Sequence, residues 1–114
     1  MVKFIALVVE DDPFQRVFLA DLLKDEGLQV IECASAEAAE LVLASTGNEL
    51  RALVTDVNLA GDMSGVELTQ LAKRRFPELN VMMVSGRGAP HVPHGVRFFL
   101  KPYMPDDLVN AIMN

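Results

Sequence analysis

Short apolar runs alternate with stretches of helical periodicity from one end of this 114-residue chain to the other. The first run is continuously apolar and the others are mostly so, which is typical of strands in a parallel sheet that is covered on both faces. The runs lie at Phe4–Val9, Leu28–Cys33, Leu50–Thr55, Asn80–Val84 and Val96–Leu100. This alternation predicts an α/β fold, a doubly wound five-stranded parallel sheet with helices on both faces. Five strands in a chain of this length favour the strand order 2-1-3-4-5.

Helix start signals stand between the runs. Pro13 occupies a first helical position directly after Asp12, a residue type that caps helices. Ser35 opens an alanine-rich stretch, and Ser64 begins a capping-box pattern. Pro105 starts a last helical stretch near the end of the chain. We therefore expect a helix after each of the first three strands and another after the fifth.

The connection between the fourth and fifth runs departs from this alternation. Arg87–Gly95 holds two glycines and two prolines within nine residues. Such a segment is too short and too interrupted for more than about one turn of helix, so the fourth helix is expected to be shortened or absent. His91 and His94 lie here without further nitrogen or sulfur ligands nearby, so a solvated loop is a better interpretation than a metal site.

Composition excludes several classes of function. The formal net charge of −6 leaves no basic surplus for the phosphates of a nucleic acid. The apolar stretches fall short of the roughly 20 residues that span a bilayer, and the N-terminus does not resemble a signal peptide. The single cysteine, Cys33, cannot form an internal disulfide and fits a reducing compartment. We expect one cytoplasmic domain, residues 1–114, that binds neither nucleic acid nor membrane.

Polar residues close four of the five strands. The first run ends in Glu10 and Asp11, the third in Asp56, the fourth in Ser85 and the fifth in Lys101. In this topology strands one and three are neighbours, so the three carboxylates should converge in one crevice at the carboxyl edge of the sheet. Carboxylates so close together repel one another unless a cation lies between them. A site made only of oxygen ligands suits Mg²⁺.

Phosphoryl transfer to a carboxylate is the chemistry that such a group supports. The reaction needs a nucleophile in line with the phosphorus, a metal on the phosphoryl oxygens, and donors for the remaining charge. Asp56 stands alone and is the natural nucleophile, whereas Glu10 and Asp11 are paired and better placed as ligands. Ser85 supplies a hydroxyl and Lys101 a positive charge for a phosphoryl oxygen.

The segments VVEDD, LVTDVNLAGDMSGVEL, VMMVSG and FFLKPY, in that order, resemble the receiver domains of response regulators. The resemblance spans essentially the whole chain and implies a flavodoxin-like fold and a role in two-component signalling. It implies that Asp56 accepts a phosphoryl group from a sensor histidine kinase or a histidine phosphotransfer protein. It further implies that Glu10, Asp11, Asp56 and the backbone carbonyl of Asn58 bind Mg²⁺. A receiver is a phosphoacceptor that assists its own phosphorylation and dephosphorylation rather than an enzyme.

The same resemblance assigns a conformational switch. Ser85 matches the switch hydroxyl, Phe98 the switch aromatic side chain, and Lys101 the lysine of the active site. Asp12 matches a frequent third acid, which lies behind the metal ligands or at the helix cap. By the same resemblance, the Lys101-Pro102 peptide is expected to be cis.

The chain departs from the usual receiver pattern in two loops and at its end. The loop after Asp56 lacks a Met-Pro pair and has one more residue before Gly65 than the commonest form. The shortened fourth helix puts the usual output surface in doubt, so we expect a monomer that meets its phosphoryl donor through the first helix. No effector domain follows before Asn114, so the chain is either a stand-alone receiver or part of a longer protein.

Three alternative functions make different demands on these residues. A haloacid-dehalogenase-type phosphatase would carry a second aspartate where this chain has Asn58. A flavodoxin-like flavin carrier would need a loop rich in glycine and hydroxyl groups after the first strand, where this chain has EDDP. A degenerate receiver that acts by protein contacts without phosphorylation remains an alternative.

Overall fold

Five parallel strands form one sheet in the order β2-β1-β3-β4-β5, which confirms the predicted fold and strand order. The structure is a computed structural model that describes residues 2–88 and 91–114. The strands are β1 (Ile5–Val9), β2 (Gln29–Cys33), β3 (Leu50–Asp56), β4 (Asn80–Ser85) and β5 (Val96–Leu100).

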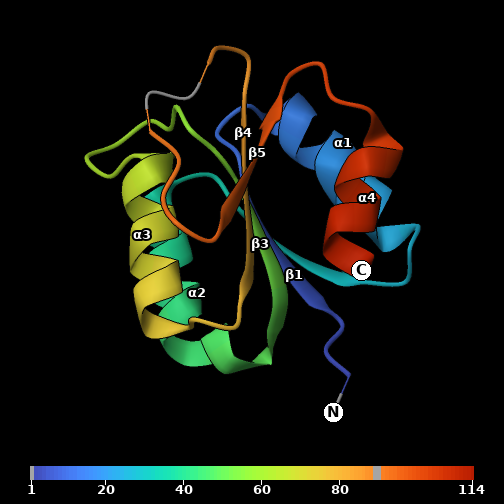
Figure 1. Ribbon diagram of the computed structural model, residues 1–114, viewed down its shortest axis with the longest axis horizontal. Helices are drawn as coiled ribbons and strands as arrows, with labels where there is room; N and C mark the ends of the chain where they lie inside the picture. The colour runs from blue at the N-terminus through green and yellow to red at the C-terminus, as the bar shows by residue number, and fades with distance from the viewer. Residues whose placement is uncertain (1, 89–90) are drawn as a thin grey trace.

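Helices cover both faces of the sheet, with α1 and α4 on one side and α2 and α3 on the other (Figure 1). The helices are α1 (Pro13–Lys24), α2 (Ala36–Thr46), α3 (Gly65–Arg75) and α4 (Pro105–Met113), with a short 3-10 helix, η1 (Gly47–Glu49), before β3. Among the described residues, no helix combines the length and the apolar character that crossing a membrane requires.

Successive residues of the central strands point into two different layers of the core, because side chains alternate along a strand. In β1, Leu7 and Val9 belong to the cluster beneath α2 and α3, whereas Ala6 and Val8 belong to the cluster beneath α1 and α4. All four are fully buried. With both faces of β1 covered, its first polar residues, Glu10 and Asp11, come directly after the strand, and this places the candidate site at the carboxyl edge.

β4 continues into β5 without a helix in residues 86–88 and 91–95, as the sequence predicts. Residues 89–90 of this connection lie outside the described residues. The peptide between Lys101 and Pro102 is cis, which confirms that prediction.

Candidate functional site

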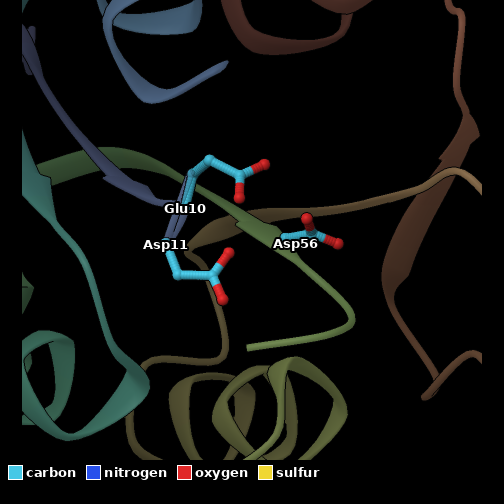
Figure 2. Close-up of side chains that lie close together, drawn as sticks. All are labelled: Glu10, Asp11 and Asp56. Atoms are coloured by element: carbon cyan, nitrogen blue, oxygen red, sulfur yellow. The ribbon is translucent and has the colours of Figure 1, made fainter. Parts of the chain in front are cut away.

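Three carboxylates meet where β1 and β3 end, as the sequence predicts for two neighbouring strands. Val9 pairs with Thr55, so Glu10 and Asp11 follow β1 beside Asp56, the last residue of β3. One carboxylate oxygen from each of these acids lies within 4.8 Å of the others. Figure 2 shows the Glu10 and Asp11 side chains one above the other at the end of β1, with the Asp56 side chain beside them at the end of β3. We call Glu10, Asp11 and Asp56 the acidic cluster.

Lys101 supplies the positive charge of the site. Its Nζ donates to Glu10 Oε1 at 3.0 Å, to Asp56 Oδ2 at 3.1 Å and to Gln15 Oε1 at 2.5 Å. Burial by itself lowers the pKa of Lys101, but the hydrogen bonds to Glu10 and Asp56 outweigh burial and raise the pKa. The lysine therefore stays protonated and balances part of the carboxylate charge.

Glu10 is the most buried member of the acidic cluster, with 3% of its surface exposed. Burial raises the pKa of Glu10 to about 7, although the N–H of Asp12 and the ammonium of Lys101 both hydrogen-bond to its carboxylate and oppose the shift. Arg16 Nη1 donates to the Glu10 carbonyl oxygen at 2.9 Å and so holds the backbone at the end of β1. Burial therefore outweighs these two hydrogen bonds, and the neighbouring Asp56 carboxylate adds to the upward shift.

The donor set of the acidic cluster fits Mg²⁺. All three side chains offer carboxylate oxygens, the ligand type that this cation prefers. Three carboxylates face one ammonium, so a divalent cation would offset their mutual repulsion. The backbone N–H of Asn58 donates to Asp56 Oδ1 at 3.2 Å. The predicted role of the Asn58 carbonyl as a metal ligand stays a prediction.

Gln15 is a site residue that the sequence reasoning missed. Its Nε2 donates to Asp12 Oδ2 at 3.1 Å while its Oε1 accepts from Lys101, so it connects the start of α1 to the lysine. Asp12 caps α1 by accepting from the N–H of Phe14 at 2.9 Å, which is one of the two places predicted for it. The hydrogen bond from the Gln15 side chain, followed by those from the backbone N–H groups of Phe14 and Gln15, lowers the pKa of Asp12. The spacing of Gln15 after the cap was visible in the sequence, but its contact with a lysine 86 positions away was not.

The two predicted switch residues lie on β4 and β5, outside the acidic cluster. Ser85 ends β4 with 1% of its surface exposed, and its Oγ accepts from the N–H of Arg87 at 3.1 Å. Phe98 pairs with Met83 in the sheet and packs against the α2–α3 layer, whereas Phe99 packs against the α1–α4 layer. Both phenylalanines are half-buried, so burial does not distinguish them, and the switch role of Phe98 stays a prediction.

A cleft of about 400 Å³ opens beside the acidic cluster, between α1 and the connection from β5 to α4. Glu10, Lys101 and Tyr103 line it together with Phe14 and Phe18, and the last two are exposed although they are large and apolar. In contrast, His91 and His94 are exposed in the β4–β5 connection and belong to no cluster of three metal-ligating side chains among the described residues.

Comparisons with known proteins give a consistent picture. The family model of the response regulator receiver domain matches residues 6–113. The nitrogen assimilation regulatory protein NtrX of Azorhizobium caulinodans is 32% identical over 110 residues, which are 90% of this chain and 24% of NtrX. The response regulator receiver protein CpdR of Brucella abortus is 30% identical over 112 residues, which are 93% of this chain and 91% of CpdR. The receiver domain of the hybrid histidine kinase CckA superimposes with a TM-score of 0.82 at 28% identity, over 96% of this chain and 95% of that domain.

The lengths of these relatives differ widely. The chain spans 24% of NtrX and between 17% and 50% of the next curated relatives that it matches, whereas it spans almost the whole of CpdR. The match therefore covers one domain that occurs in longer proteins as well as in a short one.

Proposed function

Because this chain belongs to the response regulator receiver family, we propose that it accepts a phosphoryl group on Asp56 in two-component signalling. The donor is a phosphohistidine of a sensor histidine kinase or of a histidine phosphotransfer protein. The observation that carries the proposal is the pairing of Asp56 Oδ2 with Lys101 Nζ at 3.1 Å beside two further carboxylates. A nucleophile, a cation and a metal-binding donor set thus lie together at one edge of the sheet.

In the proposed reaction, an oxygen of Asp56 attacks the phosphorus, the P–N bond of the phosphohistidine breaks, and the imidazole leaves with the electron pair. Glu10, Asp11, Asp56 and the Asn58 carbonyl would hold Mg²⁺. When bound, this ion neutralises charge on the phosphoryl oxygens. The Lys101 ammonium lies close enough to Asp56 to pair with a phosphoryl oxygen on the product. The product is an aspartyl phosphate.

Phosphorylation is proposed to act by favouring one of two packings of the sheet edge. A phosphoryl group on Asp56 draws the Ser85 hydroxyl toward it and releases the N–H of Arg87 that this hydroxyl now binds. The connection after β4 then moves, and Phe98 turns into the space that it vacates. Because no helix is present in the described part of this connection, we propose that the phosphorylated chain stays monomeric. Light scattering before and after phosphorylation tests this.

The partner is proposed to dock on α1. Phe14, Val17 and Phe18 expose an apolar surface on this helix, and Phe14 and Phe18 also line the cleft that leads to Lys101. Phe18→Glu should slow transfer from a phosphohistidine donor and leave the reaction with acetyl phosphate unchanged. Leu41→Glu is the matched control, because Leu41 is equally apolar and exposed but lies on α2.

Acetyl phosphate with Mg²⁺, followed by intact mass, tests the function directly. One phosphoryl group should appear on the wild type but not on Asp56→Asn. It should also appear on Asp62→Asn, the control, because Asp62 is an exposed aspartate in the connection between β3 and α3. The group should be labile in base, as an acyl phosphate is. Modification of Asp56→Asn would reject the assignment. An unmodified wild type would favour the degenerate receiver that signals by contacts alone.

A further inference from the structure

The connection that follows Asp56 is held by a carboxylate from a different part of the chain. Glu37 Oε2 accepts hydrogen bonds from two successive backbone amides, Asp62 at 3.0 Å and Met63 at 2.8 Å. Glu37 lies in the first turn of α2, so 25 residues separate it from Asp62. It is not a member of the acidic cluster.

A second carboxylate holds the same connection closer to its start. The N–H of Ala60 donates to Asp11 Oδ2 at 3.1 Å, while the N–H of Asn58 donates to Asp56. Asn58 and Ala60 are therefore bound to the acidic cluster, and Asp62 and Met63 are bound to Glu37. The position of Asn58 depends on both ends of this short segment.

The sequence of the connection explains why it needs such a contact. Residues 57–64 include no proline to restrict the backbone. Gly61 has φ +107, and a Cβ there would lie 2.8 Å from Glu37 Oε1. A left-handed glycine thus brings the chain directly against the Glu37 carboxylate. The loop gains from Glu37 the restraint that a proline would otherwise supply.

The hydrogen bonds to Glu37 also favour its charged form. Hydrogen bonds from its own backbone N–H and from those of Met63 and Asp62 lower the pKa of Glu37. A carboxylate that accepts several backbone N–H groups is favoured in its charged form, and such bonds are stronger than those of neutral groups.

We propose that Glu37 is a positioning residue for phosphoryl transfer: by binding Asp62 and Met63 it holds the connection that presents Asn58 to the Mg²⁺ site. This inference rests on the proposed function, because it assumes that the acidic cluster and Asn58 bind Mg²⁺. Glu37 touches neither the metal nor the phosphoryl group. Its effect should therefore be on Mg²⁺ affinity rather than on the maximal rate.

Three variants separate this role from a general loss of stability. Glu37→Ala removes the acceptor, and Glu37→Gln keeps an oxygen at the same place without the charge. Glu40→Ala is the matched control, since Glu40 lies on the same helix and its side chain makes no hydrogen bond or ion pair with the described residues. The readouts are hydrogen exchange of the Asp62 and Met63 amides, the Kd for Mg²⁺ alone by amide chemical shifts, and the rate with acetyl phosphate at several Mg²⁺ concentrations.

In Glu37→Ala the two amides should exchange faster and the Kd for Mg²⁺ should rise on the order of tenfold, as for other groups that orient metal ligands. Saturating Mg²⁺ should restore the rate. Glu37→Gln should recover part of the affinity, and Glu40→Ala should match the wild type. The inference is overturned if Glu37→Ala exposes the two amides while its Kd stays that of the wild type. A wild type that binds no Mg²⁺ and takes no phosphoryl group would instead reject the proposed function, and this inference with it.

Discussion

Two connections leave the carboxyl edge of the sheet beside the acidic cluster, and they are held in opposite ways. The β3–α3 connection has backbone amides bound by the carboxylates of Asp11 and Glu37. It ends in a capping box, in which Ser64 and Glu67 bind each other's backbone N–H. In the described part of the β4–β5 connection, the acceptors are neutral groups instead of carboxylates. The Ser85 hydroxyl accepts from the N–H of Arg87, and the Pro93 carbonyl accepts from the N–H of Val96.

The difference matches what each connection has to do in the proposed function. A metal ligand must be held in one place before the ion arrives, and charged acceptors on backbone amides achieve this. A switch must have two arrangements of similar energy, which a single neutral hydrogen bond permits. The molecule therefore places its more firmly held connection after Asp56, the proposed phosphoacceptor, and its weakly held connection after Ser85, the proposed switch hydroxyl.

The largest expected contrast is between Gly65, the first residue of α3 where the β3–α3 connection ends, and Gly86 in the β4–β5 connection. A Cβ at Gly65 would lie 1.9 Å from the Asp56 carbonyl oxygen, which is backbone and cannot move aside, whereas a Cβ at Gly86 would meet nothing within 4 Å. Gly65→Ala should therefore lower the free energy of unfolding by about 3 kcal/mol, despite the better helix propensity of alanine. Gly86→Ala should change it by about 0.5 kcal/mol or less. Urea unfolding of both variants measures this, and equal losses would remove the contrast.

Much of the fold and part of the site could be predicted from the sequence. Apolar runs and their closing residues placed Glu10, Asp11 and Asp56 together, because the topology of a parallel sheet follows from the order of its elements. The roles of Glu37 and Gly65 could not be predicted in the same way. Their partners are backbone groups, and a backbone N–H or carbonyl carries no sequence signature. The contact between Gln15 and Lys101 could not be predicted either, because it joins residues 86 positions apart in the sequence.

A smaller effect is expected from the cap of α3. Ser64→Ala removes the oxygen that accepts from the Glu67 N–H at 3.1 Å, and should cost about 1 kcal/mol of unfolding free energy. Glu67→Gln is the control, because glutamine retains the capping box. If Ser64→Ala unfolds at the same urea concentration as the wild type, the capping box does not hold this connection.

Insertion into the β4–β5 connection should have a still smaller effect on stability, and insertion should lower Mg²⁺ affinity only in the β3–α3 connection. Two glycines placed between Arg87 and Gly88 lengthen a connection with few restraints, so loop closure should cost only about 0.2 kcal/mol. The same insertion between Gly61 and Asp62 separates the amides bound by Glu37 from those bound to the acidic cluster. That second variant should lose Mg²⁺ affinity while the first keeps it. Equal Mg²⁺ affinities in the two insertion variants would contradict the proposed difference in restraint.

The smallest expected effect is a pH dependence confined to the restrained connection. Hydrogen bonds from its own N–H, Met63 and Asp62 lower the pKa of Glu37 from its ordinary value of 4.5. A carboxyl group whose folded pKa is depressed contributes stability above its unfolded pKa, and that contribution is lost as the pH falls through the folded pKa. The restraint on Met63 should therefore persist at pH 4.5 and disappear below it.

The amide chemical shift of Met63 measures this step, with Arg87 as the internal comparison, because the hydroxyl that binds the Arg87 amide does not titrate in this range. The carboxylates of Asp11 and Asp62 also border the connection. Their contribution remains in Glu37→Gln, so the difference between the two titrations isolates Glu37. The wild type should show a step with a midpoint below 4.5 that Glu37→Gln lacks. A midpoint at or above 4.5, or an identical step in both proteins, would mean that the Glu37 carboxylate does not hold this connection in solution.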